Sequence, residues 1–149
     1  MNREKNKRIV ILMADDDPDD RMLTKEALEE NNLAHDLNFV NDGVQLMDYL
    51  YRRDGYNETN APKPGLILLD LNMPKMDGRE ALCEIKKNPK FKRIPVVILT
   101  TSRAEEDIMN TYDLGVNSFI SKPVMFKDLV EVTRQIGEYW FGVVDLPKN

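Results

Sequence analysis

The chain has 149 residues, of which 42% are hydrophobic and 32% are charged, and its formal net charge is −5 at pH 7. This length suits one domain with a sizeable core. The acidic balance argues against nucleic acid or an anionic membrane surface as a partner. The single cysteine, Cys83, excludes an internal disulfide. No signal peptide or long apolar segment is found, so we expect a cytoplasmic protein.

Short apolar runs recur along the chain and predict β-strands. They are "IVILM" (9–13), "LNFV" (37–40), "LILLD" (66–70), "VVILT" (96–100) and "SFI" (118–120). Most of them are continuous rather than alternating, which is typical of strands that are covered on both faces.

Helical spacing of apolar residues lies between and after these runs. The expected helices span 19–31, 44–53, 79–87, 105–114 and 126–141. This alternation of strand and helix predicts an α/β fold, a doubly wound parallel sheet with helices on both faces. The segment 54–65 is rich in Pro, Gly and Asn and is expected to be an exposed connection.

Polar side chains stand where the predicted strands end. Asp15 and Asp16 follow the first strand, Asp70 ends the third, Thr100 ends the fourth and Lys122 follows the fifth. Because the carboxyl ends of parallel strands meet at one edge of the sheet, we expect these side chains to gather there.

The stretch "MADDDPDD" (13–20) holds five aspartates in eight positions. Asp17 suits a helix N-cap and Pro18 the first helical position. Asp19 and Asp20 then fall in the first turn, where the helix dipole favours negative charge. These three acids have a structural explanation, whereas the two that precede the cap do not.

Asp15, Asp16 and Asp70 would repel one another if they were held together without a cation. Two unit charges at ~4 Å repel by about 1 kcal/mol in water and about 4 kcal/mol near a protein surface. A divalent cation offsets that repulsion, and hard oxygen ligands suit Mg²⁺. A carboxylate beside a metal can attack phosphorus, and Lys122 and the Thr100 hydroxyl could then contact oxygens of the transferred group.

In these residues and their spacing, the chain resembles the receiver domain of two-component response regulators over about 8–137. The resemblance implies a flavodoxin-like receiver fold, with five parallel strands in the order 2-1-3-4-5 and five helices. It implies that Asp70 is the phosphoacceptor, and that Asp15, Asp16, Asp70 and the backbone carbonyl of Asn72 bind Mg²⁺. No other cofactor is expected.

The same resemblance assigns the remaining roles. Thr100 corresponds to the switch hydroxyl, Lys122 to the lysine that pairs with the phosphoryl group, and Phe119 to the aromatic switch residue. The peptide between Lys122 and Pro123 is expected to be cis.

The implied function is that of a stand-alone response regulator in the cytoplasm. A sensor histidine kinase or a relay protein would donate the phosphoryl group, and the chain would promote its own phosphorylation and dephosphorylation without being a turnover enzyme. We expect one receiver domain over 1–149, with a core at about 8–137 and a C-terminal extension at about 138–149. That tail and "NPKFKRIPVVILTTS" (88–102) also resemble the small receivers that partner bacterial phytochromes.

Two other functions remain open at this point. A phosphatase of the haloacid dehalogenase type would use a similar set of residues, but it needs a second aspartate two positions after the nucleophile, where this chain has Asn72. A receiver-like scaffold that is never phosphorylated is the other alternative, and the complete set of site residues argues against it.

The last predicted helix carries more apolar surface than one face needs. Leu129, Val132 and Ile136, with Tyr139 or Trp140, suffice to cover the sheet, which leaves Val130, Phe141, Val143, Val144 and Leu146. This surplus favours a homodimer through the face built from 105–114, 118–120 and 126–141, together with the tail. The basic run "KKNPKFKR" (86–93) is typical of a solvated loop.

Overall fold

The computed structural model describes residues 9–34, 36–102 and 104–143, with side chains as far as residue 140. One sheet of five parallel strands has the order β2-β1-β3-β4-β5. The strands are β1 (Ile11–Ala14), β2 (Leu37–Val40), β3 (Leu66–Leu69), β4 (Val96–Thr100) and β5 (Ser118–Ser121). The predicted sheet and its strand order are confirmed.

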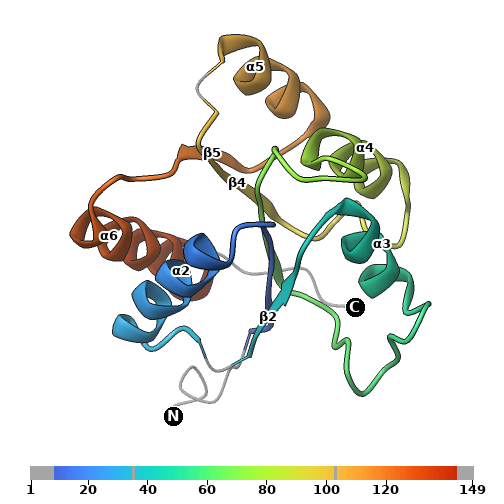
Figure 1. Cartoon of the computed structure of the whole chain (residues 1–149), viewed down its shortest axis with the longest axis horizontal. Helices are drawn as coiled ribbons and strands as arrows, with labels where there is room; N and C mark the ends of the chain where they lie inside the picture. The colour runs from blue at the N-terminus through green and yellow to red at the C-terminus, as the bar shows by residue number, and fades with distance from the viewer. Residues whose placement is uncertain (1–8, 35, 103, 144–149) are drawn as a thin grey trace.

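The helices lie on both faces of the sheet. They are α2 (Pro18–Glu30), α3 (Gly43–Tyr51), α4 (Gly78–Lys87), α5 (Glu105–Leu114) and α6 (Phe126–Gly137). Figure 1 shows α2 beside α6 on one side, with α3 and α4 on the other. Among the described residues, no helix is both long enough and apolar enough to span a membrane.

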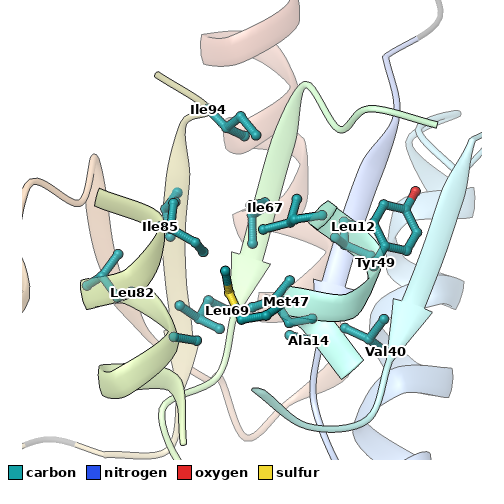
Figure 2. Packing of buried hydrophobic residues seen from close by; sticks show 14 of the residues in the cluster. Leu12, Ala14, Val40, Met47, Tyr49, Ile67, Leu69, Leu82, Ile85 and Ile94 are labelled. Carbon is teal, nitrogen blue, oxygen red and sulfur yellow. The ribbon is translucent and has the colours of Figure 1, made fainter. Parts of the chain in front are cut away.

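The central strands β1 and β3 are apolar at every position because both of their faces are buried. Ile11 and Met13 pack toward α2 and α6, in a cluster that includes Ile136. Leu12 and Ala14 point the other way, into the cluster between the sheet and the helices α3 and α4. Figure 2 shows this larger cluster, in which β1 and β3 contribute side chains to the same layer.

Aspartates cap the helices α2, α3 and α4 at the carboxyl edge of the sheet. The Asp17 side chain accepts a hydrogen bond from the backbone N–H of Asp19 at 2.9 Å, and Pro18 starts α2, as expected. Asp42 caps α3 in the same way, and Asp77 caps α4. Each cap satisfies N–H groups that a helix start leaves without partners.

The C-terminal helix ends earlier than the sequence predicts. α6 stops at Gly137, and a π-helix, η1 (Glu138–Val143), follows it. A Cβ at Gly137 would lie 2.5 Å from a methyl carbon of Leu33, so this position admits only glycine without a shift of that side chain. Trp140 is buried in the cluster beneath α6, whereas Tyr139 is exposed. Trp140 is therefore the residue that continues the core-facing stripe.

Part of the predicted surplus lies outside the described residues or side chains. This applies to Phe141, Val143, Val144 and Leu146. Val130 is half-buried on α6.

The connection at 54–65 is mostly exposed, as expected, but its second half is held against the domain. Ala61 is buried. The Tyr49 hydroxyl donates to the carbonyl of Pro62 at 2.8 Å, and Arg52 Nε donates to the carbonyl of Ala61 at 3.1 Å. Two side chains at the end of α3 thus hold this connection against the domain.

Candidate functional site

Three carboxylates meet at the carboxyl edge of the sheet, as predicted. Asp15 directly follows β1 and Asp70 directly follows β3, and these strands are neighbours. Oxygen atoms of Asp15, Asp16 and Asp70 lie within 4.8 Å of one another. Asp15 and Asp70 are buried, whereas Asp16 is exposed. The group therefore has an open side that faces solvent.

The Asp70 carboxylate is held by three neighbours. Its Oδ1 accepts hydrogen bonds from the Thr100 hydroxyl at 2.6 Å and from the backbone N–H of Asn72 at 3.2 Å. Its Oδ2 accepts from Lys122 Nζ at 3.1 Å. The predicted phosphoacceptor is thus in direct contact with both the predicted hydroxyl and the predicted lysine.

Lys122 provides the positive charge of the site. Its Nζ lies 2.6 Å from Asp15 Oδ2, 2.7 Å from Asp20 Oδ2 and 3.1 Å from Asp70 Oδ2. Burial alone would lower the pKa of Lys122, but hydrogen bonds and charges from these acids raise it above its usual value. Lys122 therefore remains protonated across the physiological range.

Asp15 is the least exposed of the three carboxylates. Its side chain is fully buried, and burial raises its pKa although the hydrogen bonds from Lys122 and from the backbone N–H of Asp17 act in the opposite direction. Arg21 Nη1 also donates to the backbone carbonyl of Asp15 at 2.7 Å. Hydrogen bonds to the side chain and to the backbone carbonyl of Asp15 thus hold the end of β1 in place.

Asp20 is a site residue that the sequence analysis missed. We expected it only to interact with the helix dipole, yet its carboxylate pairs with Lys122 across 102 positions of the chain. Side chains on a helix tilt toward its N-terminus. An acid at the third position of α2 therefore points back toward the end of β1, and this was the available signal.

The geometry tests the predicted roles of Phe119 and Asn72 only in part. Phe119 is half-buried on β5 and packs against the cluster beneath α3 and α4, outside the group around Asp70. Its backbone N–H donates to the hydroxyl of Tyr112 on α5 at 3.2 Å. Asn72 contributes its backbone N–H to Asp70, and a role for its carbonyl stays a prediction.

The expected cis peptide before Pro123 is wrong, because the described residues contain no cis peptide bond. The trans form is the intrinsically preferred isomer even before proline. The backbone N–H of Lys122 donates to the carbonyl of Thr100 at 2.7 Å.

A second polar network beside the site was also missed. Ser102 Oγ donates to Asp107 Oδ2 at 2.7 Å, and Arg79 donates to both Asp107 oxygens, each at 2.7 Å. The Arg79 guanidinium lowers the pKa of Asp107 to about 2, although burial acts in the opposite direction. The network joins the start of α4 to α5, and its residues are far apart in sequence.

The donor set fits a hard divalent cation. Asp15, Asp16 and Asp70 each offer a carboxylate oxygen, and oxygen ligands from carboxylates and carbonyls are those that Mg²⁺ and Mn²⁺ prefer. No thiolate or imidazole belongs to this group of described residues, so a softer metal has no matching ligands here.

Known proteins match this chain in sequence and in structure over nearly their whole length. The chain is 44% identical to the response regulator Rcp1 of Synechocystis over 147 residues, which is 99% of each chain. A crystal structure of the Mn²⁺-bound form of Rcp1 matches with a TM-score of 0.85 over 94% of this chain and 99% of that chain. The phosphorylated cyanobacterial phytochrome response regulator RcpA matches with a TM-score of 0.88 at 43% identity, over 95% of this chain and all of that chain.

A family model described as the response regulator receiver domain matches residues 11–134. This range holds all five strands and every site residue discussed above. The chain belongs to the response regulator receiver family, whose members are signalling proteins that partner histidine kinases and bind a divalent metal.

Proposed function

We propose that Asp70 accepts a phosphoryl group from the phosphohistidine of a sensor histidine kinase or a relay protein, in a reaction that depends on Mg²⁺. The observation that carries the proposal is the contact of Asp70 with both Thr100 and Lys122, beside the carboxylates of Asp15 and Asp16. In this reaction an Asp70 oxygen forms a bond to phosphorus as the bond from phosphorus to the histidine nitrogen breaks.

Each neighbour of Asp70 has a part in the transfer. Asp15, Asp16 and Asp70, with the backbone carbonyl of Asn72, would hold the ion, which supplies positive charge to the oxygens of the transferred group when bound. Lys122 neutralises a further oxygen from its protonated amine. The Thr100 hydroxyl, which donates to Asp70 at 2.6 Å before transfer, would then donate to the phosphoryl group.

The acyl phosphate would act by biasing a two-state equilibrium. Thr100 moves toward the phosphoryl group and Phe119 turns inward, which changes the surface formed by α5, β5 and α6. The output is then a change in partner binding or an onward phosphotransfer. Two arrangements of one surface are enough to carry a signal, provided that a partner prefers one of them.

The first test is phosphate uptake from acetyl phosphate with Mg²⁺. The parent should take up one acid-labile, hydroxylamine-sensitive phosphoryl group, and Asp70→Asn should take up none, because the nucleophilic oxygen is lost. Asp19→Asn is the matched control: it removes a charge from the same acidic stretch but leaves the Asp70 group intact, so it should be labelled like the parent. Undiminished labelling of Asp70→Asn would contradict the assignment.

The same assay separates the alternatives. Many turnovers on phosphomonoesters would indicate a phosphatase, and no labelling at all would indicate a scaffold. Asn72 stands where the phosphatase needs its second aspartate, which supports a phosphoacceptor rather than a turnover enzyme.

We further propose that the kinase is a phytochrome and that the chain acts in the cytoplasm as one receiver domain with a C-terminal extension. Similarity to RcpA, described as a cyanobacterial phytochrome response regulator, and to a bacteriophytochrome response regulator at 36% identity supports the partner. Phosphotransfer profiling against the histidine kinases of the source organism tests it. Fastest transfer from a kinase without a phytochrome module would reject this partner while leaving the acceptor role of Asp70 intact.

A homodimer is proposed through the face formed by α5, β5 and α6. Exposed apolar side chains on or near this face support it: Met109, Tyr112, Val124, Met125, Phe126 and Tyr139. Such patches commonly mark interaction surfaces.

A further inference from the structure

A cavity lies at the amino ends of β3 and β4, at the opposite edge of the sheet from Asp70. Its volume is about 680 Å³. The lining comes from the end of α3 (49–52), from the connection before β3 (61 and 63–65) and from the loop before β4 (89–95). No residue of the proposed phosphorylation site lines it.

The floor of this cavity is apolar and aromatic. Tyr49, Phe91 and Ile94 are all less than 10% exposed and belong to the core cluster beneath α3 and α4. Figure 2 shows Ile94 at the upper end of that cluster, the Tyr49 ring beside Leu12, and Leu69 lower down. Phe91 also meets the ring of Tyr51 edge-on, with centroids 5.0 Å apart. The floor can therefore receive a flat apolar group.

The rim of the cavity is strongly basic. Among its lining residues are Arg52, Lys63, Lys90, Lys92 and Arg93, and no lining residue is Asp or Glu. All five are exposed. Arg52 forms a salt bridge at 4.0 Å with Glu58, which does not line the cavity. On a chain whose net charge is −5, this concentration of positive charge favours an anion.

The walls are held in place by hydrogen bonds, so the cavity is preformed. Asn88 fixes the loop before β4: its side-chain oxygen accepts from the backbone N–H of Lys90 at 2.7 Å, and its amide donates to the Tyr51 hydroxyl at 2.9 Å. Lys86 Nζ donates to the carbonyl of Lys92 at 3.3 Å. In the basic run 86–93, Lys90, Lys92 and Arg93 are exposed, as expected, while Asn88 and Phe91 contact Tyr51 on α3.

We propose that this cavity binds a small organic anion carried on a flat aromatic ring, of which nucleotides and aromatic carboxylates are the two common sources. Ligand sites of roughly 300–1,000 Å³ with an apolar lining and a few polar groups are typical of small molecules. The ring would lie on the aromatic floor around Phe91, and the anion would face the basic rim. The volume suits one such molecule rather than an extended peptide.

Isothermal titration calorimetry of the intact chain at low salt tests the proposal with four probes. AMP and 4-hydroxybenzoate combine ring and charge, adenosine has the ring without the charge, and inorganic phosphate has the charge without the ring. Either AMP or 4-hydroxybenzoate should bind, and the tighter of the two identifies the source. Adenosine and phosphate should each bind about tenfold more weakly, because each lacks one of the two contacts.

Two double variants with the same change in net charge distinguish a contribution of the rim charges to binding from a general effect of the net charge. Lys90→Gln with Arg93→Gln should weaken binding by about tenfold, because two favourable charges are removed. Lys25→Gln with Lys127→Gln, on α2 and α6, should leave it unchanged. Circular dichroism and thermal melting of both variants confirm folding.

Several results would overturn the proposal. These are no binding of either ring-bearing anion, phosphate binding as tightly as they do, or equal loss in the two double variants. Tighter binding of hexaglutamate than of either ring-bearing anion would also overturn it, and would indicate an acidic protein partner instead.

Discussion

At the scale of single residues, Lys122 explains how the chain tolerates so many aspartates in one stretch. Its amine contacts Asp15, Asp20 and Asp70 while its side chain is only 11% exposed. A buried carboxylate such as Asp15 costs several kcal/mol if it is left without a partner. Lys122, which follows β5, supplies that partner. Asp17 caps α2, Asp19 lies in its first turn, and Asp16 is exposed to solvent.

Mg²⁺ should stabilise the fold through the three carboxylates. A ligand that binds only the native state adds roughly 2.7 kcal/mol at a hundredfold excess over its dissociation constant. Asp16→Ala should lose most of the rise in melting temperature on addition of Mg²⁺, because it removes the solvent-facing ligand. Asp20→Asn is the control: it changes a neighbouring acid that contacts Lys122 but lies outside the group of three, so its Mg²⁺ response should persist. An unchanged response in Asp16→Ala would place the metal elsewhere.

Gly78 should be intolerant of any side chain. A Cβ at this position would lie 2.2 Å from the backbone oxygen of Asp70 and 2.7 Å from the Cα of Leu71. Gly78→Ala should therefore destabilise the fold by about 1–3 kcal/mol and displace the phosphoacceptor. Urea unfolding and acetyl phosphate labelling measure the two effects. Parent-like values in both would show that the backbone around Asp70 yields without consequence.

Most site residues were predictable from the sequence because each stands directly at a strand end. Asp15, Asp70 and Thr100 needed only the rule that parallel strands end at one edge. Asp20 was not assigned to the site because its partner is distant in sequence, and its place in a helix start already explained it.

At the scale of elements, α4 and α5 are joined through Arg79 and Asp107. The pair is bidentate, and Ser102 donates to the same carboxylate from the loop after β4. Arg79 Nη1 also approaches the carbonyl of Leu71 at 3.5 Å, next to the phosphoacceptor. The backbone N–H of Ser102 also donates to Thr100 Oγ1 at 3.4 Å, so Ser102 connects Thr100 to Asp107 on α5.

The Arg79–Asp107 ion pair makes a pH-dependent contribution to the free energy of unfolding. The pKa of Asp107 falls to about 2 in the folded state, against about 3.9 in an unfolded chain. The contribution is present above pH ~4 and is lost as the pH falls toward 2, because the unfolded state binds the proton more readily.

Asp107→Asn should thus be less stable than the parent by about 1–2 kcal/mol at pH 7, after allowance for the partly exposed Arg79. The difference should shrink between pH 4 and pH 2. Urea unfolding of both proteins across this range measures it. Asp113→Asn, on the same helix, is the control and should follow the parent at every pH. A gap that stays constant down to pH 2 would contradict the assigned pKa.

The central strands were predictable because burial on both faces leaves an unbroken apolar signal, and most helices because their apolar residues recur at helical spacing. The end of α6 was not, since the apolar spacing continues past Gly137 while the helix type changes. The connection at 54–65 has a polar composition, and its burial at Ala61 comes from hydrogen bonds made by α3. Composition alone does not reveal such tertiary contacts.

At the scale of the whole molecule, the two edges of the sheet differ in charge and chemistry. The carboxyl edge gathers acids around Lys122, and the amino edge carries the basic cavity. A third surface, over α5, exposes apolar side chains: Met109 is 64% exposed and Tyr112 is 49% exposed.

The homodimer proposed for that surface should weaken when its apolar area gains a charge. Met109→Glu should reduce dimer affinity by about tenfold or more, because burying a methionine contributes about 1.5–3 kcal/mol and a buried carboxylate opposes association. Val44→Glu is the matched control, since Val44 is 40% exposed on α3, which packs against α4 and β2. Sedimentation equilibrium measures both. A monomeric parent, or equal weakening by both changes, would reject this interface.

The identity of the phosphorylated side chain tests the proposed function most directly. Borohydride reduces an acyl phosphate of aspartate to homoserine, so peptide mass spectrometry after labelling by a phosphohistidine donor and Mg²⁺ reads out the modified position. Homoserine should be found at position 70, because Asp70 alone among the clustered acids contacts both the hydroxyl of Thr100 and the amine of Lys122. Homoserine at position 15, 16 or 20, with none at position 70, would contradict it.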